Sequence, residues 1–254
     1  MARAMASLKE NRTTRTAFWS SIALALLACA PQLMGPILAE ALGRFERTYT
    51  PRGTARVTIS NVNGNIHVNA WDRKTVSVRA HTNGSVSIED QTIGDDIKVV
   101  VKRDLRLGRS DFEVSVPPDT SLELKSFLGD IEVSGVSGHV GINSIDSNIR
   151  LVGLNSPTID AKVTTGDIFF DGELHDGGSY SLQSMKGDID VTVPASTPFN
   201  LNARALSENI NLGSFLSSFS RATKGPKGVS GSHLNGGPWL KLTAYAGRIL
   251  LHKK

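Results

Sequence analysis

The chain has 254 residues, a formal net charge of +4 and a single cysteine. One cysteine excludes an intramolecular disulfide. The basic residues form no clustered face of the kind that nucleic-acid binding requires, so no nucleic acid is expected as a partner. Residues 1–41 hold four basic and two acidic residues, and the rest of the chain therefore carries a net charge of only +2. The remaining stretch, about 213 residues, fits one repeat domain.

Residues 1–41 have the organisation of a signal peptide or membrane-targeting segment. A basic beginning precedes an apolar run at 17–30, which Pro31 ends before it is long enough to span a bilayer. Ala39-Glu40-Ala41 is an A-x-A site and predicts cleavage after Ala41. We therefore expect a signal helix and export to the periplasm, the outer membrane surface or the extracellular space; an uncleaved membrane anchor is the alternative.

Cys29 closes the tetrapeptide Leu26-Leu27-Ala28-Cys29, which is similar to a bacterial lipobox. In a lipobox the cysteine carries a lipid and becomes the mature N-terminus. A lone cysteine in an apolar run is otherwise a small hydrophobic residue. We expect membrane contact only through the N-terminal segment or through lipidation at Cys29.

Residues 42–121 alternate apolar and polar side chains with a loose period and are expected to form N-terminal β coils and a cap. Asn63-Gly64 and Asn83-Gly84 are strong tight-turn dipeptides. The charged stretch 102–111 is predicted to be a solvated loop. A cap is needed because an unpaired first strand would offer its backbone to another molecule.

Residues 122–212 repeat one pattern: a short alternating run, a polar or glycine turn, and a second alternating run. Period-two alternation is typical of strands with one face in a core. The isoleucines that follow the turns are 18, 19, 21 and 21 residues apart: Ile131, Ile149, Ile168, Ile189 and Ile210. Repetition at a nearly fixed period indicates a repeat architecture.

A period near 20 residues predicts an all-β fold, a parallel β-solenoid whose two-strand coils stack about 4.8 Å apart. An antiparallel sandwich also alternates with frequent turns and is the alternative. Gly-Asp-Ile recurs at 129–131, 166–168 and 187–189, which favours the solenoid because a stack needs the same corner in every coil. We expect the isoleucines to form one column.

The regular solenoid repeats are expected to span 122–254, with a flexible loop at 213–237. The pattern breaks after Ile210 and returns at Ile249, 39 residues later. The intervening stretch is rich in glycine and serine, and a long stretch of this kind is functional or disordered. The terminal Lys253 and Lys254 are expected on an exposed edge, where they discourage further pairing.

Four segments stand out for their composition and turns: VPPDTSLELKSFLGDIEVSGVSGHVGINS, TTGDIFFDG, MKGDIDVTVPAS and LNGGPWLKLTAYAGRILL. They resemble the bacterial DUF4097 family, whose members are provisionally labelled adhesins. The resemblance covers roughly Arg56 to Leu251 and implies an exported envelope protein with a β-solenoid-like fold and no known catalytic residues. The chain departs from Gly-Asp-Ile at 147–149, 208–210 and 247–249, so a role that needs an unbroken aspartate column is not implied.

Acidic and amide side chains occupy equivalent corners: Asp130, Asp167, Asp188, Asn65, Asn148 and Asn209. One interpretation is a calcium ladder, since Ca²⁺ takes several oxygen ligands. The other is turn chemistry, because Asp and Asn accept from nearby backbone N–H groups. Each coil offers at most one carboxylate, so we favour turn chemistry and predict no metal site and no cofactor.

No catalytic motif is present: the sequence has no H-E-x-x-H, G-x-S-x-G or P-loop. The six histidines have no ligand-like spacing and are expected at the surface: His67, His81, His139, His175, His233 and His252. Some β-helices cleave polysaccharides with charged residues on one face, and the outward candidates are Glu132, Arg150, Asp160, Lys162, Asp171 and Asp190. A repeat surface always exposes alternating charges, so we favour a solvated face.

Trp71, Trp239 and Tyr245 could stack on sugars, but their positions at strand ends favour covering the ends of the core. The sequence thus predicts a non-enzymatic, exported envelope scaffold, adhesin-like or structural, with an unknown envelope protein or polysaccharide as partner. A polysaccharide-binding or polysaccharide-cleaving β-helix is the alternative.

Overall fold

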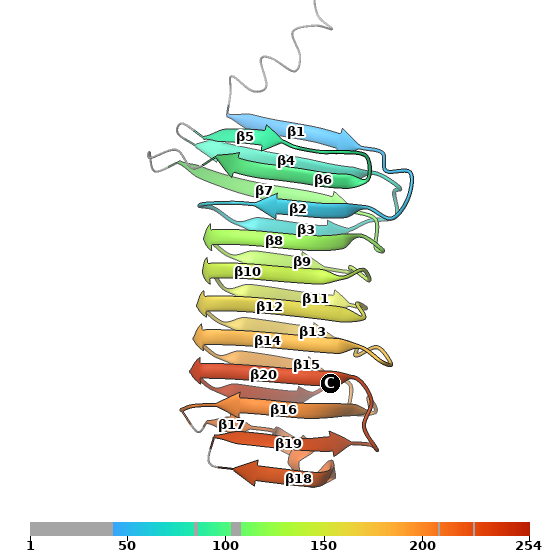
Figure 1. Ribbon diagram of the computed structural model, residues 1–254, viewed down its shortest axis with the longest axis vertical. Helices are drawn as coiled ribbons and strands as arrows, with labels where there is room; N and C mark the ends of the chain where they lie inside the picture. The colour runs from blue at the N-terminus through green and yellow to red at the C-terminus, as the bar shows by residue number, and fades with distance from the viewer. Residues whose placement is uncertain (1–42, 84–85, 103–107, 208, 226) are drawn as a thin grey trace, which may run out of the picture. The chain divides into compact units, whose positions relative to one another are not determined.

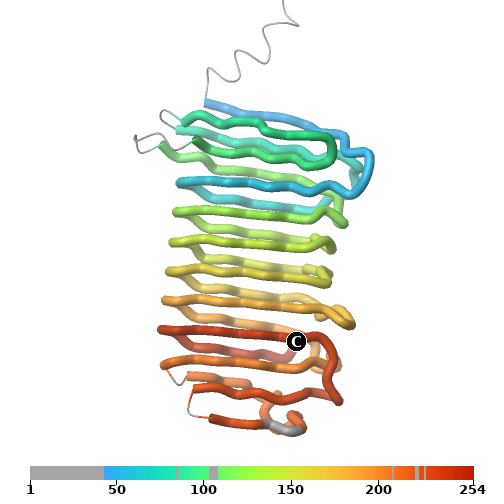
Figure 2. Tube along the Cα trace, viewed as in Figure 1, coloured from blue at the N-terminus to red at the C-terminus, as the bar shows by residue number. Residues whose placement is uncertain are grey.

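The computed structural model describes residues 43–83, 86–102, 108–207, 209–225 and 227–254. These residues form two β-sheets that face each other, one of ten strands and one of eleven (Figure 1). Most neighbouring strands within each sheet run parallel, and the chain passes from one sheet to the other and back (Figure 2). The predicted fold class, a parallel β-solenoid, is confirmed.

We call the ten-stranded sheet, which lies behind in Figure 1, sheet A. In spatial order its strands are β1 (Arg44–Tyr49), β4 (Val76–Asn83), β7 (Arg109–Val116), β3 (Ile66–Ala70), β9 (Ile131–Ser134), β11 (Ile149–Leu154), β13 (Ile168–Gly172), β15 (Ile189–Val193), β21 (Ile249–Lys253) and β17 (Ile210–Asn211).

The eleven-stranded sheet, nearest the viewer in Figure 1, is sheet B. Its strands, in spatial order, are β18 (Phe219–Gly225), β19 (Gly228–His233), β16 (Phe199–Ala205), β20 (Trp239–Ala246), β14 (Ser179–Lys186), β12 (Thr158–Thr165), β10 (Val140–Asp146), β8 (Ser121–Leu128), β2 (Arg56–Ser60), β6 (Asp96–Lys102) and β5 (Ser87–Asp90).

The four coils from β8 to β15 stack in chain order, each with one strand in each sheet. Ile149 pairs in register with Ile131 on one side and with Ile168 on the other, and Ile168 pairs with Ile189. The predicted isoleucine column is therefore confirmed. Each of these isoleucines is at most 1% exposed, and burial of such a side chain contributes about 1.5–3 kcal/mol.

The C-terminal coil, β20 and β21, leaves chain order. β20 lies between β14 and β16, and β21 lies between β15 and β17. Ile249 consequently pairs with both Ile189 and Ile210. The terminal lysines are exposed, as expected, but their strand is not the edge of the sheet, because β21 has β15 on one side and β17 on the other. Lys253 pairs with Val193, and its Nζ lies 4.8 Å from the ring centre of Phe215.

Residues 213–237, predicted to be a flexible loop, instead form a 3-10 helix, η1 (Gly213–Ser218), and the antiparallel hairpin of β18 and β19. The prediction was wrong because four rings give this stretch a core of its own. Phe199, Phe215, Phe219 and His233 have ring centres 5.0 to 6.0 Å apart in the contacting pairs. These rings cover the open end of the stack. The glycine- and serine-rich composition of residues 213–237 hides this role in the sequence.

The N-terminal end also departs from chain order, since β2 lies between β6 and β8, and β3 between β7 and β9. β4 and β1 then extend sheet A in antiparallel pairing. Tyr49 of β1 donates to Asp90 of β5 at 2.7 Å and so joins the two sheets. Burial, together with this carboxylate, raises the pKa of the Tyr49 hydroxyl. β7 begins at Arg109, inside the predicted solvated loop.

Candidate functional site

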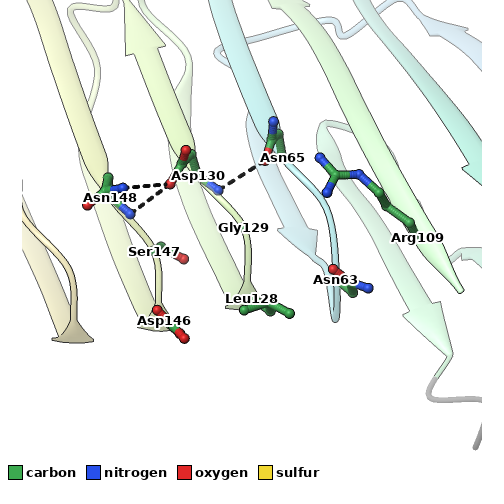
Figure 3. Close-up of a pocket in the computed structure, with 9 residues that line it drawn as sticks. All are labelled: Asn63, Asn65, Arg109, Leu128, Gly129, Asp130, Asp146, Ser147 and Asn148. Carbon is green, nitrogen blue, oxygen red and sulfur yellow. Dashed lines mark hydrogen bonds between the residues drawn. The ribbon is translucent and has the colours of Figure 1, made fainter. Parts of the chain in front are cut away.

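A polar hollow of about 440 Å³ lies at the corner where each coil passes from sheet B to sheet A (Figure 3). Nine residues from neighbouring coils line it: Asn63, Asn65, Arg109, Leu128, Gly129, Asp130, Asp146, Ser147 and Asn148. The corner brings together three side chains that lie far apart in sequence, Asn65, Asp130 and Asn148, because each directly precedes the first residue of a sheet A strand.

Glycine shapes this corner because neighbouring turns touch backbone to backbone. Gly166 has φ of +128°, and a Cβ there would lie 2.0 Å from the Ser147 carbonyl oxygen. Gly187 has φ of +149°, and its Cβ would lie 2.1 Å from the Gly166 oxygen. Only glycine combines a positive φ with so close an approach, which explains the Gly in the recurring Gly-Asp-Ile.

The Asp and Asn side chains of this corner join successive coils through hydrogen bonds. The Asp130 N–H donates to Asn65 Oδ1 at 3.1 Å, and the Asn148 N–H donates to Asp130 Oδ1 at 3.0 Å (Figure 3). The same bond continues from the Asp167 N–H to Asn148 Oδ1 at 3.1 Å and from the Asp188 N–H to Asp167 Oδ1 at 2.7 Å. We call this series the corner ladder.

An arginine stands at each end of the corner ladder. Arg109 donates to Asp111, whose Oδ1 also accepts the Asn65 N–H at 2.8 Å. Arg248 donates to Asp188 Oδ2 at 2.6 Å through its guanidinium and to Oδ1 at 2.7 Å through its main-chain N–H. These guanidinium hydrogen bonds lower the pKa of the Asp111 and Asp188 carboxyls.

The chemistry of the corner follows from these bonds. One oxygen of each ladder side chain is occupied by the backbone of the next coil, so the ladder acts first as a connection between layers. This is the turn chemistry expected from the sequence, extended from one turn to the next. Among the described residues, no three His, Cys, Asp or Glu side chains lie close enough to hold a metal ion.

A second hollow of about 400 Å³ lies beside the corner on the outer face of sheet A, and its lining includes Asp130 and Asn148. His67 Nδ1 lies 3.4 Å from Glu132 Oε2, and the Arg150 guanidinium lies 4.4 Å from the ring centre of Phe169. The His67 and Glu132 side chains are 42% and 43% exposed. Solvent therefore reaches these groups, and water weakens the electrostatic effect that each has on its neighbour.

A family model described as Toastrack DUF4097 matches residues 48–249. The chain belongs to the Toastrack DUF4097 family. Among solved structures it is similar to a candidate cell adhesion protein from Clostridium sporogenes, with 12% identity, a TM-score of 0.51, and coverage of 83% of this chain and 99% of that one. A candidate adhesin from Bacteroides fragilis has 11% identity, a TM-score of 0.34, and coverage of 83% and 97%. No curated protein matches.

At 12% identity the Clostridium sporogenes structure shows a shared fold alone. That fold agrees with the β-solenoid-like architecture of the Toastrack family described above. The match of the family model to residues 48–249 confirms the family resemblance noted in the sequence.

The charged residues singled out in the sequence divide between the two faces of this Toastrack chain. Glu132, Arg150, Asp171 and Asp190 belong to sheet A, whereas Asp160 and Lys162 belong to β12 of sheet B. Many are already paired: Lys162 with Asp160 at 2.7 Å, Lys254 with Asp171 at 2.8 Å, and His252 with Asp190 at 3.4 Å. The structure therefore does not assemble them into one site.

The histidines are spread along the stack, as their spacing suggests. His139 lies 3.4 Å from Glu123, and His81 and His175 are exposed. His233 is the exception to the surface prediction: it is 2% exposed, and its Nε2 lies 3.1 Å from the Ala195 carbonyl oxygen. Its ring belongs to the aromatic cluster at the end of the core.

The two tryptophans singled out in the sequence have different roles. Trp71 Nε1 donates to the Thr75 carbonyl at 2.7 Å and closes the turn between β3 and β4. Trp239 was expected to cover an end of the core, and this was wrong, because it points outward from β20 and is 59% exposed. Tyr245 points outward from the same strand and is 40% exposed.

The predictions for residues 1–41, including cleavage after Ala41 and lipidation at Cys29, lie outside the described residues. Within the part of the chain that the structure describes, no helix is long and apolar enough to cross a membrane.

Proposed function

We propose that this chain is an exported, non-catalytic interaction scaffold of the bacterial cell envelope, with an adhesin-like role. One observation carries the proposal: stacking in register turns every outward position into a straight row across several coils. Two flat faces of repeated side chains are suited to contacting an extended partner. The polar groups of the corner hollow meanwhile connect the coils to one another.

Two further findings support the proposal. The structure that shares this fold at a TM-score of 0.51 is named a cell adhesion protein candidate. Export is supported by the basic and apolar organisation of residues 1–41 and by the A-x-A site that ends at Ala41.

The proposal is tested by incubating the full chain with a panel of envelope and plant polysaccharides and envelope proteins. Bound ligand and newly formed reducing ends are measured in the same samples. We expect binding to at least one partner and no new reducing ends. If new reducing ends appear with the unchanged chain, vanish with Glu132→Gln and persist with the control Glu123→Gln on sheet B, the chain is an enzyme and the scaffold proposal is wrong.

The location is tested by mass spectrometry of the N-terminus of the protein purified from its native host. We expect a chain that begins at Leu42, or one that begins at a lipidated Cys29. An intact leader on protein recovered from the cytosol would contradict export.

A further inference from the structure

Five neighbouring strands at the C-terminal end of sheet B contain no aspartate or glutamate. They are β14, β20, β16, β19 and β18 (Figure 1). The strands that continue the same sheet, β12, β10 and β8, each contain an acid. The acids nearest in sequence are Asp176 and Asp188, before and after β14, and Glu208, three residues after β16. We call the outer face of β14, β20 and β16 the acid-free face.

The acid-free face carries cations without a counter-charge. Arg204 and Lys241 are both exposed, and neither forms an ion pair with another described residue. Elsewhere the chain pairs many of its cations, as in the 2.7 Å contact of Lys162 with Asp160. Unpaired cations on a face without acids produce a positive potential that attracts an anionic partner.

Two exposed aromatic side chains stand on the same face. Trp239 and Tyr245 both point outward from β20, and six residues of strand place them about 20 Å apart. Trp239 is 59% exposed, the largest exposed fraction among the aromatic side chains of the described residues. A tryptophan left open on a flat sheet face loses the stabilisation that burial would give it, and such exposed apolar surface marks interaction sites.

Amide and hydroxyl side chains fill the space between the two rings. Ser179 and Asn200 flank Trp239 on the neighbouring strands, and Ser181 and Asn202 flank Lys241. In the next row, Gln183 and Arg204 flank Thr243. The Asn200 amide is already used within the fold, since its Nδ2 donates to the Gly237 carbonyl at 2.8 Å and its Oδ1 accepts from Ser232 at 2.7 Å. The other groups are able to donate and accept hydrogen bonds, and they lie in a grid with the spacing of the strands, about 4.8 Å.

This combination matches the chemistry of an acidic sugar polymer. Aromatic faces stack on the C–H faces of sugar rings, amides and hydroxyls bond to sugar hydroxyls, and cations attract carboxylates. A bare polyanion would not use an exposed tryptophan, and a lipid surface would not use a row of amides. We propose that the acid-free face binds an acidic polysaccharide, with Trp239 and Tyr245 as stacking platforms and Lys241 and Arg204 facing its carboxylates.

The inference rests on the proposed scaffold function and names its partner class. The test measures binding of the full chain to two uronate polymers, polygalacturonate and alginate, with neutral dextran, polyglutamate and duplex DNA as comparisons. We expect binding to at least one uronate polymer that weakens as salt is added, and little binding to the comparisons. Trp239→Ala should weaken binding on the order of tenfold, as for an aromatic hot spot.

Lys241→Gln provides a second variant that leaves the apolar surface intact. It should weaken binding several-fold and reduce the salt dependence, because one cation of the face is lost. Ile93→Ala and Lys98→Gln are matched controls, since both side chains are exposed at the other end of the stack, and they should bind like the unchanged chain. Thermal unfolding of each variant checks that it is folded.

Three results would overturn the inference: no binding to either uronate polymer, equal binding to polyglutamate or DNA, or unchanged binding in folded Trp239→Ala. Each of these leaves the scaffold function standing if the chain binds another envelope partner. Release of reducing ends in the same incubation would instead contradict the scaffold function, so the two failures are distinguishable.

Discussion

The middle of the stack and its two ends differ in how the order of the strands in space follows the order in the chain. From β8 to β15, neighbours in sequence are neighbours in space, and each coil repeats the corner of the one before it. At each end, two coils are exchanged relative to chain order. β2 and β3 lie nearer the middle of the stack than β6 and β7, although they come earlier in the chain, and β20 and β21 lie nearer the middle than β16 and β17, although they come later. Antiparallel strands then complete sheet A beyond β7 and sheet B beyond β16.

The comparison shows that position in the stack, and not position in the chain, decides how a residue is packed. Ile249 lies five residues from the C-terminus yet is fully buried between two coils. Ile210, although 39 residues earlier in the chain, is only partly buried because its strand is the last of sheet A. This difference can be tested by mutation.

The largest effect is expected from deleting residues 239–254. The deletion removes a layer that pairs with strands on both sides, and the remaining strands β16 and β17 lose their parallel neighbours. We expect the cooperative thermal transition to disappear. The control lacks only Lys253 and Lys254 and should keep the transition. A cooperative transition in the longer deletion would contradict the importance of this layer.

Alanine substitutions along the isoleucine column should follow the stack. Ile168→Ala and Ile249→Ala remove fully buried side chains and should each lower the free energy of unfolding by about 2–5 kcal/mol. Ile210→Ala, at the edge of the same column, should cost clearly less. Urea unfolding measures all three, and an Ile249→Ala cost as small as that of Ile210→Ala would show that the inserted coil is loosely packed.

Glycine substitutions distinguish two causes of destabilisation, a clash with the neighbouring backbone and an unfavourable backbone φ. Gly166→Ala places a methyl group 2.0 Å from the Ser147 carbonyl and should lower the free energy of unfolding by about 3 kcal/mol or more. Gly153 has φ of +61° but no atom within 4 Å of its Cβ position, so Gly153→Ala should cost only about 1 kcal/mol. Equal costs in urea unfolding would mean that the coils separate easily at the corner.

The corner ladder is tested at Asn148, which accepts from the Asp167 N–H and donates to Asp130. Asn148→Ala should lower the free energy of unfolding by about 1 kcal/mol at any pH. Asn148→Asp keeps the acceptor but puts four carboxylates on consecutive rungs, so its cost should be present at pH 7 and diminish when these groups are protonated in acid. A cost of Asn148→Asp that does not depend on pH would exclude charge repulsion as its cause.

The smallest effect is expected at the Arg248 end of the ladder. Arg248 lowers the pKa of the folded Asp188 carboxyl, so its contribution to stability is complete above the ordinary Asp pKa, about 4, and is lost as the pH falls toward the folded value. Arg248→Gln should therefore be slightly less stable than the unchanged chain at pH 7 and equal to it in strong acid. Urea unfolding at both pH values measures this difference, with Lys98→Gln as a surface control. A destabilisation by Arg248→Gln that is larger in strong acid than at pH 7 would contradict the prediction.

The sequence predicts the middle of the molecule well because one signal is repeated there. Period-two alternation places the strands, and the recurring Gly-Asp-Ile places the corner, since both reflect contacts that every coil makes. The order of the end coils cannot be predicted in the same way. Gly247-Arg248-Ile249 matches the corner pattern, but that pattern would be the same whichever coils lay beside it. Local patterns describe a coil, but the choice of its neighbours is made by long-range packing.

The candidate site was only partly predictable for the same reason. The Asp and Asn side chains at equivalent corners indicated turn chemistry, but not the hydrogen bonds that join one coil to the next. No local pattern links Arg109 and Arg248, which end the ladder, to the carboxylates. The exposure of Trp239 was missed because its position just before a strand favoured covering an end of the core. The alternation of β20 holds the signal, since Leu240 and Leu242 point inward and Trp239 must therefore point outward.

The insertion of β20 and β21 has a consequence for how the protein is made. The gap beside β14 and β15 is filled by residues 239–254, which are synthesised after the strands β16 to β19. A growing chain therefore cannot close its stack one coil after another. Residues 199–233 must wait beside an empty place until β20 and β21 have left the ribosome, and a chain that stops before residue 239 would remain open to proteases at this place.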